Sequence, residues 1–258
     1  MILEVKNLCA GYGKTEILHD VSFSLEPGTM TGLLGANGSG KTTLMKSLCG
    51  LIPHTGQTLL NGIPMEGMSP RTLAKNCSLI SQRSGITIDL SALDVVLMGF
   101  NARLGLLEYP SKQMQAAARR ALDAVGLQGM EERNFQTLSE GQKQLCILAR
   151  TLVTEGSLLL MDEPESALDF FGRYRLLLEV KRFLGGSRAA LVTLHDPQLA
   201  LNCCDRLLLL KDGRVLGTLE PRRDSLEDME RKLTQVYGSL TLLRVQNHSG
   251  DPQLVLVK

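Results

Sequence analysis

A glycine-rich stretch near the N-terminus has the composition and spacing of a phosphate-binding loop. Residues 35–42 are Gly-Ala-Asn-Gly-Ser-Gly-Lys-Thr and fit the pattern G-x4-G-K-[ST]. Glycines let the backbone curl so that N–H groups point at phosphate oxygens, and the N-terminus of a following helix adds partial positive charge. Lys41 would then reach the β and γ phosphates, and the Thr42 hydroxyl would ligate Mg²⁺. The predicted nucleotide-binding residues here are Gly35, Asn37, Gly38, Ser39, Gly40, Lys41, Thr42 and Thr43.

A pair of acids follows an apolar run further along the chain. Residues 157–163, Ser-Leu-Leu-Leu-Met-Asp-Glu, are typical of a buried strand that ends in two carboxylates. Ligands of open α/β sheets bind at the carboxyl ends of the strands. Asp162 would hold Mg²⁺, and Glu163 would act as the general base that polarises the attacking water. Each pattern alone has a plainer alternative, a turn without a ligand or an acidic loop cap, but together they favour catalysis.

The segments around these residues predict the elements that position them. Short apolar runs alternate with helical patterns, which indicates a parallel sheet covered by helices. The stretch from about residue 83 to 155 differs, because its pattern is mainly helical, and the tail is expected to hold one helix and two short strands. The predicted strands are 1–6, 21–25, 30–34, 158–162, 189–194, 206–210, 240–245 and 254–257. The predicted helices are 44–51, 112–125, 139–154, 172–184 and 226–236.

Length, charge, apolar runs and cysteine content exclude few functions, but they indicate the general class of protein. The 258 residues carry a net charge of +1, which gives no electrostatic support for nucleic acid as a partner. No apolar run approaches the roughly 20 residues that span a bilayer, and the first residues lack the features of a signal peptide. We therefore expect a cytoplasmic protein. The six cysteines show no CxxC pair, so reduced and mostly buried thiols are expected.

The order of five further motifs resembles the ATP-binding cassette (ABC) ATPases. Residues 138–142, Leu-Ser-Glu-Gly-Gln, resemble the family signature Leu-Ser-Gly-Gly-Gln and precede the strand that carries Asp162. Gln82 resembles the glutamine of the Q-loop, and residues 166–169, Ser-Ala-Leu-Asp, resemble the D-loop. His195 looks like the switch histidine, and Tyr12 stands where the family places an aromatic that stacks on adenine. The resemblance extends from about residue 3 to residue 220.

The resemblance implies a role for each matching residue. Gln82 would join Thr42 and Asp162 at Mg²⁺ and report to a membrane partner, and His195 would bond the γ phosphate and orient Glu163. The signature residues Ser139, Gly141 and Gln142 would serve the ATP of an opposing subunit, and Ser166 and Asp169 would be the site residues of the D-loop. Taken singly, Ser139 with Gln142 is also a helix capping box, His195 could be a structural histidine, Tyr12 could be packing, and Gln82 could be surface.

Two residues depart from the family pattern. Glu140 replaces the first glycine of the signature, and its carboxylate should turn outward because it would repel the γ phosphate. Gly141, the glycine that matters most for phosphate contact, is kept. Glu165 stands where the family often has threonine, and the sequence gives no interpretation of it.

The fold implied is an α/β P-loop NTPase (RecA-like) core with a mostly parallel sheet, an N-terminal antiparallel β subdomain and an inserted α-helical subdomain. Residues 1–258 would form a single ATPase domain. Residues 1–82 and 156–220 would form the nucleotide-binding core, 83–155 the helical subdomain, and 221–258 an appendage whose role the sequence does not indicate.

The resemblance also implies a function. The chain would hydrolyse ATP as a head-to-tail homodimer, peripheral on the inner face of the cell membrane, beneath permease subunits fed by a substrate-binding protein. Three stretches resemble importers of iron–siderophore, haem or cobalamin: His195-Asp196-Pro197, residues 167–170 and Val236-Tyr237-Gly238. Residues 95–98 and 104–107 would line the groove for the permease's coupling helix, or pack in the core. The alternatives are another cargo, an exporter and, further removed, a non-transport ABC ATPase. A P-loop kinase or GTPase would lack the signature.

Overall fold

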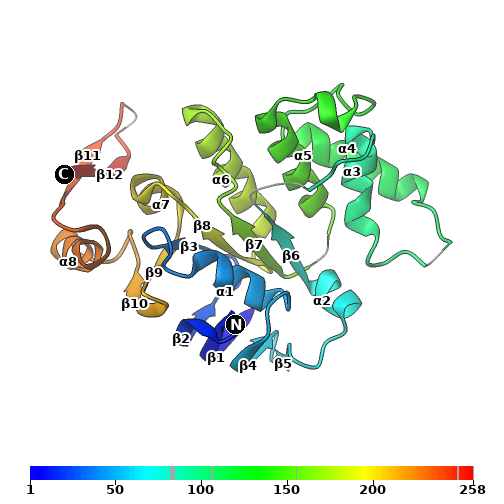
Figure 1. The fold of residues 1–258 in the computed structure, drawn as a ribbon. Coiled ribbons are helices and arrows are strands. Elements are labelled where there is room, and N and C mark those ends of the chain that lie inside the picture. The colour runs from blue at the N-terminus through cyan, green and yellow to red at the C-terminus, as the bar shows by residue number, and fades with distance from the viewer. Residues whose placement is uncertain (82–84, 106, 155, 249, 258) are drawn as a thin grey trace.

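The computed structural model describes residues 1–81, 85–105, 107–154, 156–248 and 250–257. A six-stranded sheet forms its centre, in the order β10-β9-β3-β8-β7-β6 (Figure 1). All neighbouring strands are parallel except β9 and β10. The predicted mostly parallel sheet is therefore confirmed. Its strands are β3 (Met30–Leu34), β6 (Cys77–Ile80), β7 (Leu158–Asp162), β8 (Ala189–Thr193), β9 (Arg206–Lys211) and β10 (Arg214–Leu219).

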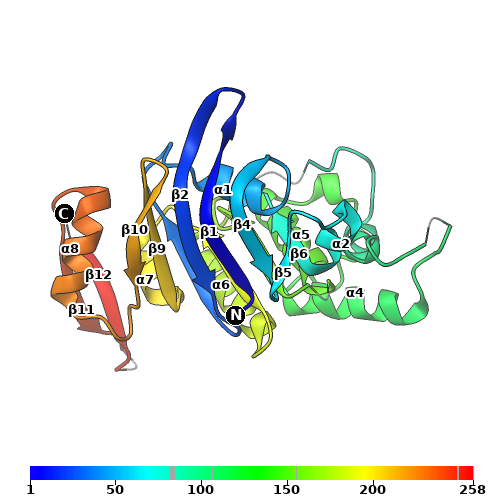
Figure 2. The ribbon, with the colours of Figure 1, turned by 90° about the horizontal axis from the view of Figure 1, so that it is seen from below.

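A second, antiparallel sheet holds the N-terminal strands in the order β2-β1-β4-β5 (Figure 2). Helix α1 (Lys41–Leu48) contacts both β1 and β7, so it lies between the two sheets. This arrangement confirms the predicted N-terminal antiparallel subdomain. The strands are β1 (Leu3–Tyr12), β2 (Thr15–Leu25), β4 (His54–Leu60) and β5 (Ile63–Pro64).

The inserted segment is helical, as predicted, but its helices are separated by 3₁₀ turns and loops. Helices α3 (Ala92–Leu97), α4 (Lys112–Ala124) and α5 (Glu140–Leu152) pack against one another, with 3₁₀ turns η1 (Met98–Phe100) and η2 (Phe135–Thr137) between them. Helix α2 (Pro70–Asn76) precedes β6, and α6 (Phe170–Leu184) and α7 (Pro197–Cys203) pack against each other. The longest described helix has 15 residues, and none in the described ranges is both long and apolar enough to cross a bilayer.

Each central strand divides its side chains between two hydrophobic clusters. Neighbours on a strand point to opposite faces, so Leu158 and Leu160 join the cluster beneath the antiparallel sheet. Leu159 and Met161 join the cluster shared with the helices. Such burial on both faces explains why the strands are uninterrupted apolar runs rather than alternating ones.

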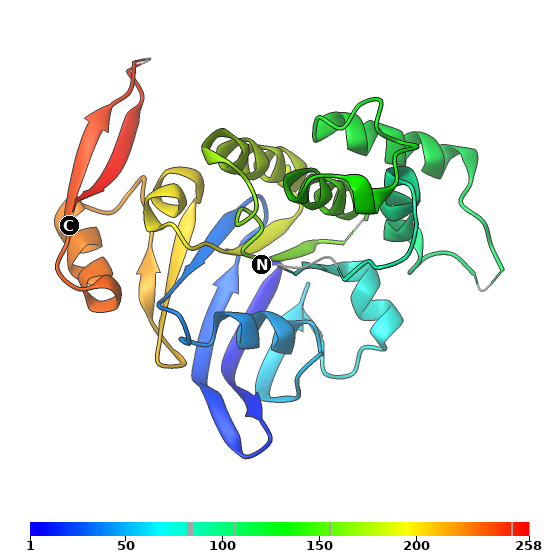
Figure 3. The same cartoon turned by 45° about the horizontal axis from the view of Figure 1, so that its top comes forward.

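The C-terminal segment consists of α8 (Leu226–Tyr237) and a separate hairpin of β11 (Thr241–Gln246) and β12 (Pro252–Val257). The predicted helix and both predicted strands are confirmed. The hairpin stands at the opposite end of the molecule from α4 and α5 (Figure 3). Strand β12 packs on α7, and α8 packs on β9 and β10.

Two helices start earlier than their apolar patterns predict. Helix α1 begins at Lys41, directly after Gly40, whose φ of +104° ends the glycine loop. Helix α6 begins at Phe170 because the Asp169 side chain caps it, accepting the Gly172 N–H at 2.7 Å. In both cases a polar or glycine start signal, rather than the apolar face, sets the first turn.

Candidate nucleotide-hydrolysis site

The glycine loop joins β3 to α1 in a conformation that depends on its glycines. Gly38 has φ +80° and Gly40 φ +104°, both in the left-handed region. A Cβ on Gly35 would lie 2.4 Å from the Leu210 carbonyl oxygen and 2.5 Å from Ser39 Oγ. The predicted strand–loop–helix context is present, and the loop has no room for side chains at its narrowest point.

Lys41 folds back over this loop. Its Nζ donates to the Gly35 carbonyl at 2.8 Å and to the Ala36 carbonyl at 3.2 Å. Burial lowers the pKa of Lys41, while the carboxylates of Glu163 and Asp162 act to raise it. The ammonium is thus close enough to both predicted catalytic acids to sense their charge.

Ser39 Oγ is buried and has no hydrogen-bond partner within the described ranges. A buried hydroxyl without a partner, in a glycine loop that leads into the N-terminus of α1, is what a loop shaped for an anionic ligand would leave. The loop therefore fits a nucleotide phosphate.

Thr193, which the sequence did not single out, ties the two acids together. Its hydroxyl donates to Asp162 Oδ1 at 2.8 Å and accepts the Glu163 N–H at 2.8 Å. Thr193 is fully buried at the end of β8, the strand beside β7. The sequence holds one hint of this role, because the apolar run of β8 ends in a hydroxyl residue. Only the order of the strands in the sheet, however, places Thr193 next to Asp162.

Glu163 and His195 approach each other as the resemblance implied. His195 Nε2 lies 3.2 Å from Glu163 Oε1. Glu163 has φ +50°, a conformation that side chains other than glycine, asparagine and aspartate seldom adopt. This backbone turn directs its carboxylate toward the histidine rather than along the strand.

Glu165 supports the backbone of the switch segment. Its Oε1 accepts the His195 N–H at 3.1 Å, and its side chain is only 2% exposed. Burial raises the pKa of Glu165, and the nearby charge of Glu163 adds to that rise. Its Oε2 has no partner in the part of the chain that the structure describes. No role for Glu165 could be predicted from the sequence, as for Thr193, and its contact with the His195 backbone is found only in the structure.

The signature segment begins α5 with the capping box that its sequence permits. Ser139 Oγ accepts the Gln142 N–H at 3.2 Å, and Gln142 Oε1 accepts the Ser139 N–H at 3.0 Å. Glu140 is on the surface, with 76% of its side chain exposed, and it pairs with Lys143 at 2.8 Å. Gly141 lies beside the D-loop, because a Cβ there would be 3.2 Å from Leu168 Cδ2.

The signature helix α5 and the glycine loop are attached to different strands of the central sheet. Helix α5 packs on β6 and α6 and on the other helices of the insert. Strand β6 is three positions from β3 in the sheet, roughly 14 Å at ordinary strand spacing. The structure therefore brings Lys41, Asp162, Glu163 and His195 together at one sheet edge, while Ser139 and Gly141 start a helix anchored on another strand.

Most of the remaining predicted residues that the structure describes are exposed, where a ligand or another chain could contact them. Tyr12 is 51% exposed at the end of β1. Ser166 and Asp169 are exposed, as are Asn37 and Thr42, whereas Thr43 is buried under the loop. Gln82 lies outside the described residues.

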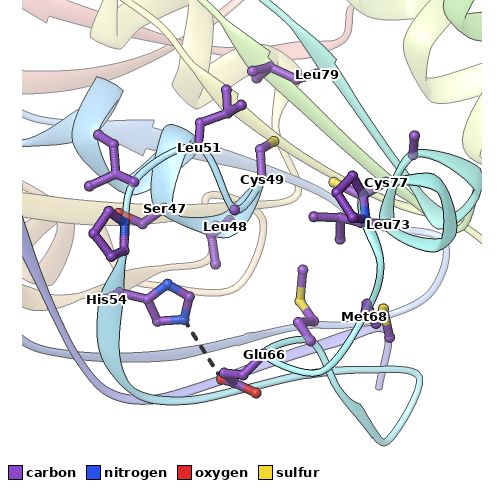
Figure 4. A pocket seen from close by; sticks show the side chains of 16 residues that line it. Ser47, Leu48, Cys49, Leu51, His54, Glu66, Met68, Leu73, Cys77 and Leu79 are labelled. Atoms are coloured by element: carbon purple, nitrogen blue, oxygen red, sulfur yellow. Dashed lines mark ion pairs between the residues drawn. The ribbon is translucent and has the colours of Figure 1, made fainter.

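A separate cavity of about 660 Å³ lies between the end of α1 and helix α2 (Figure 4). It contains His54 Nε2, 3.7 Å from Glu66 Oε1, and it holds none of the predicted site residues. Cys49 and Cys77 also line it, and a hydrogen bond from one thiol to the other, together with burial, raises the pKa of Cys77. All six cysteines are free in the structure, and four of them are buried.

The glycine loop after a central parallel strand, with acids at the end of a strand on the same edge, defines a P-loop nucleotide hydrolase. The family described as "ABC transporter" matches residues 18–166, more than half of the chain. The chain therefore belongs to the ABC transporter family, among its ATP-binding subunits, the ATPases that power transport.

Curated relatives and solved structures agree with this family. The chain is similar to the hemin import ATP-binding protein of Pseudomonas putida, with 35% identity over 98% of this chain and 99% of that protein. It is 34% identical to the probable iron chelatin transport ATP-binding protein of Helicobacter pylori, over 83% of this chain and 86% of that one. A structure described as a metal-chelate type ABC transporter, inward-facing, superposes with TM-score 0.83 at 25% identity, covering 100% and 98% of the chains.

Proposed function

We propose that this chain is the ATP-hydrolysing motor of an importer for an iron chelate, either siderophore or haem, or for cobalamin. The cargo would pass through a separate permease. The support is the set of relatives named for hemin import and iron chelatin transport, together with the metal-chelate type structure. The first relative and that structure match the chain almost end to end, the C-terminal segment included, and not only over the ATPase core.

The observation that carries the ATPase chemistry is the Glu163–His195 contact of 3.2 Å beside the Lys41 ammonium. We assign Glu163 as the base that orients water, His195 as the residue that orients Glu163 and bonds the γ phosphate, and Lys41 as the phosphate ligand. Tyr12 would stack on adenine. Phosphoryl transfer of this kind is catalysed by positioning and electrostatics more than by covalent chemistry.

The site also offers oxygen ligands for a hard cation. Thr42, Gln82 and Asp162 would hold Mg²⁺, and Thr193 fixes Asp162 by donating to its Oδ1 at 2.8 Å. Mg²⁺ bound there would neutralise negative charge on the phosphates.

We further propose that a complete site needs two copies of the chain. Ser139, Gly141 and Gln142 start a helix anchored three strands away from the glycine loop, so their N–H groups would serve the ATP of a partner. The exposed D-loop residues Ser166 and Asp169 would lie at the same interface. Such a pair is head-to-tail with two ATP molecules sandwiched.

The motor would sit in the cytoplasm against the inner face of the membrane, under a permease that a substrate-binding protein feeds, with no nucleic-acid partner. Of the two stretches expected in the coupling groove, Val95 and Val96 are buried and belong to the core instead. Met98 is 36% and Leu107 89% exposed, so these two are the candidates for contact with the permease.

The test of the ATPase assignment is steady-state turnover of Lys41→Ala against Lys46→Ala. Both lysines belong to α1, but Lys46 is exposed in its last turn. We expect Lys41→Ala to lose at least about a hundredfold in kcat/KM for Mg-ATP, and Lys46→Ala to keep wild-type turnover. Equal activities of the two variants would refute the assigned site.

The test of the cargo is uptake into vesicles that hold this chain, its permease and its binding protein. Ferric siderophore, haem and cobalamin would be offered separately, with ATP inside. Uptake of one of them that Lys41→Ala abolishes supports the proposal. ATP-driven movement of another cargo, or movement out of the vesicles, contradicts it.

A further inference from the structure

The D-loop turn between Glu163 and helix α6 is held by its own backbone. The Glu163 carbonyl accepts the Ser166 N–H at 3.2 Å. The Glu165 carbonyl accepts the Leu168 N–H at 3.0 Å. The Leu168 carbonyl in turn accepts a hydrogen bond at 3.0 Å from Arg173 Nε, in the first turn of α6. The turn and the start of α6 therefore form one hydrogen-bonded unit.

The Glu165 side chain leaves this turn and reaches the segment that carries the switch histidine. Its Oε1 accepts the His195 N–H at 3.1 Å, across 30 positions of sequence. His195 lies in the short connection from β8 to α7, immediately before Asp196. Asp196 caps α7 by accepting two backbone N–H groups of its first turn, at 2.9 and 3.2 Å. One side chain thus joins the segment after β7 to the segment after β8.

A carboxylate at this position is costly to the folded chain. Glu165 is buried, and its Oε2 has no partner among the described residues. The negative charge of Glu163 disfavours a second one nearby. Buried polar atoms without a partner are rare in folded proteins, and local costs of this kind are found at functional sites. The contact with the His195 backbone is therefore better explained by hydrolysis than by stability.

We propose that Glu165 is a positioning residue for ATP hydrolysis, which joins the D-loop turn to the switch histidine of the same chain. Ser166 and Asp169 are the D-loop residues proposed to face a partner. Contact with a partner that fixes the D-loop then also fixes His195, whose Nε2 lies 3.2 Å from Glu163 Oε1. The inference rests on the proposed function and adds a route by which the pairing of two chains controls hydrolysis.

Glu165→Leu and Glu165→Gln test the side chain, because leucine accepts no hydrogen bond whereas glutamine keeps the acceptor. We expect kcat to fall about tenfold in Glu165→Leu, since His195 is displaced, and to stay within about twofold of wild type in Glu165→Gln. KM for Mg-ATP should be nearly unchanged in both variants, because the glycine loop is untouched. Equal kcat of Glu165→Leu and wild type overturns the proposal.

The control for lost stability is Glu230→Leu, which removes a carboxylate of the C-terminal segment that accepts the Leu242 N–H at 2.8 Å. This variant should lower the thermal midpoint without changing kcat. A merely structural role of Glu165 would likewise move the thermal midpoint and leave kcat of the folded enzyme unaltered.

Mixing with a second defective chain shows on which active site Glu165 acts. In a pair of one Glu165→Leu chain and one Ser139→Glu chain, one site takes its loop and His195 from the second chain and its signature from the first. That site is intact, so an equimolar mixture should recover roughly a quarter of wild-type turnover, because half of the pairs are mixed.

A pair of Glu165→Leu and Lys41→Ala chains holds no intact site and should add nothing to the residual activity of Glu165→Leu. Recovery with Lys41→Ala would instead place the action of Glu165 on the site of the other chain and overturn the proposal. Recovery with neither Lys41→Ala nor Ser139→Glu refutes the two-chain site on which the proposal rests.

Hydrogen exchange tests the contact without any ATP hydrolysis. In Glu165→Leu we expect the backbone amides of residues 165–168 and 194–196 to exchange faster than in wild type and in Glu165→Gln. Should wild type itself not turn over ATP, the proposed function fails, and this comparison then decides the inference. Equal exchange in the three proteins overturns it.

Discussion

A hydrogen bond from its backbone N–H, rather than from its side chain, holds Glu163 in place. Its φ of +50° carries strain of order 1–3 kcal/mol. Such a conformation persists when neighbours over-determine it, and here the Thr193 hydroxyl accepts the Glu163 N–H while donating to Asp162. One buried hydroxyl thereby orients both the proposed base and the proposed metal ligand.

Thr193→Val should therefore damage both stability and turnover. The shape is kept, but the Glu163 N–H loses its acceptor, which costs about 1–3 kcal/mol of unfolding free energy. We expect kcat to fall about tenfold or more, because the base is misplaced. Thr31→Val is the matched control: its hydroxyl is buried without a partner in the described residues, so valine should be neutral or stabilising. Denaturant titration and turnover of both variants measure this, and equal behaviour would contradict the assigned role of Thr193.

Glu165 predicts a pH dependence of stability. Burial raises its pKa in the folded state above the unfolded value of about 4.3, so charging it opposes folding. The unfolding free energy of wild type relative to Glu165→Gln should be highest below pH 4.3 and fall as pH rises from there through the folded pKa. Glutamine keeps an acceptor for the His195 N–H. Unfolding curves of both proteins between pH 4 and 8 test this, and a constant difference would show that Glu165 does not resist ionisation.

At the scale of elements, the order of strands decides which motifs can meet. The glycine loop, the acid pair and His195 could be predicted to share one edge, because each follows a strand of a parallel sheet. The pairing of β8 with β7, which brings Thr193 to Asp162, could not be predicted. The sequence indicates where strands lie along the chain but not which strands are neighbours in the sheet. Strand β10 and helix α2 were also not expected, because short partly exposed runs have weak periodicity.

The signature helix offers a test that separates capping from catalysis. Ser139→Ala should lower the unfolding free energy by about 1 kcal/mol, because it removes the N-cap of α5. Ser111→Ala removes the N-cap of α4 in the same way and should lower it similarly. Only Ser139→Ala should also lower ATP turnover. If both variants keep wild-type turnover, Ser139 serves the helix alone.

At the scale of the whole molecule, the separation of α5 from the glycine loop makes the dimer testable by mixing. A Lys41→Ala chain has a defective loop, and a Ser139→Glu chain has a signature that repels phosphate. In a head-to-tail pair of the two, one site combines both defects and the other is complete. An equimolar mixture should thus recover roughly a quarter of wild-type turnover, since half the dimers are mixed and each holds one intact site. Each variant alone should stay inactive; a mixture as inactive as its components would argue that each site lies within a single chain.

The hairpin at the end of the chain has a further consequence for how the protein behaves in concentrated solution. Its two strands form a sheet of their own, and Gln198 and Asn202 occupy the outer side of β12 as a third strand otherwise would. Removing the Asn202 amide would uncover a template on which a strand from another molecule can add. Association through added strands has no fixed number of copies and does not depend on nucleotide. The ATP-bound assembly, in contrast, stops at two chains. Light scattering with and without ATP would tell the two kinds of association apart.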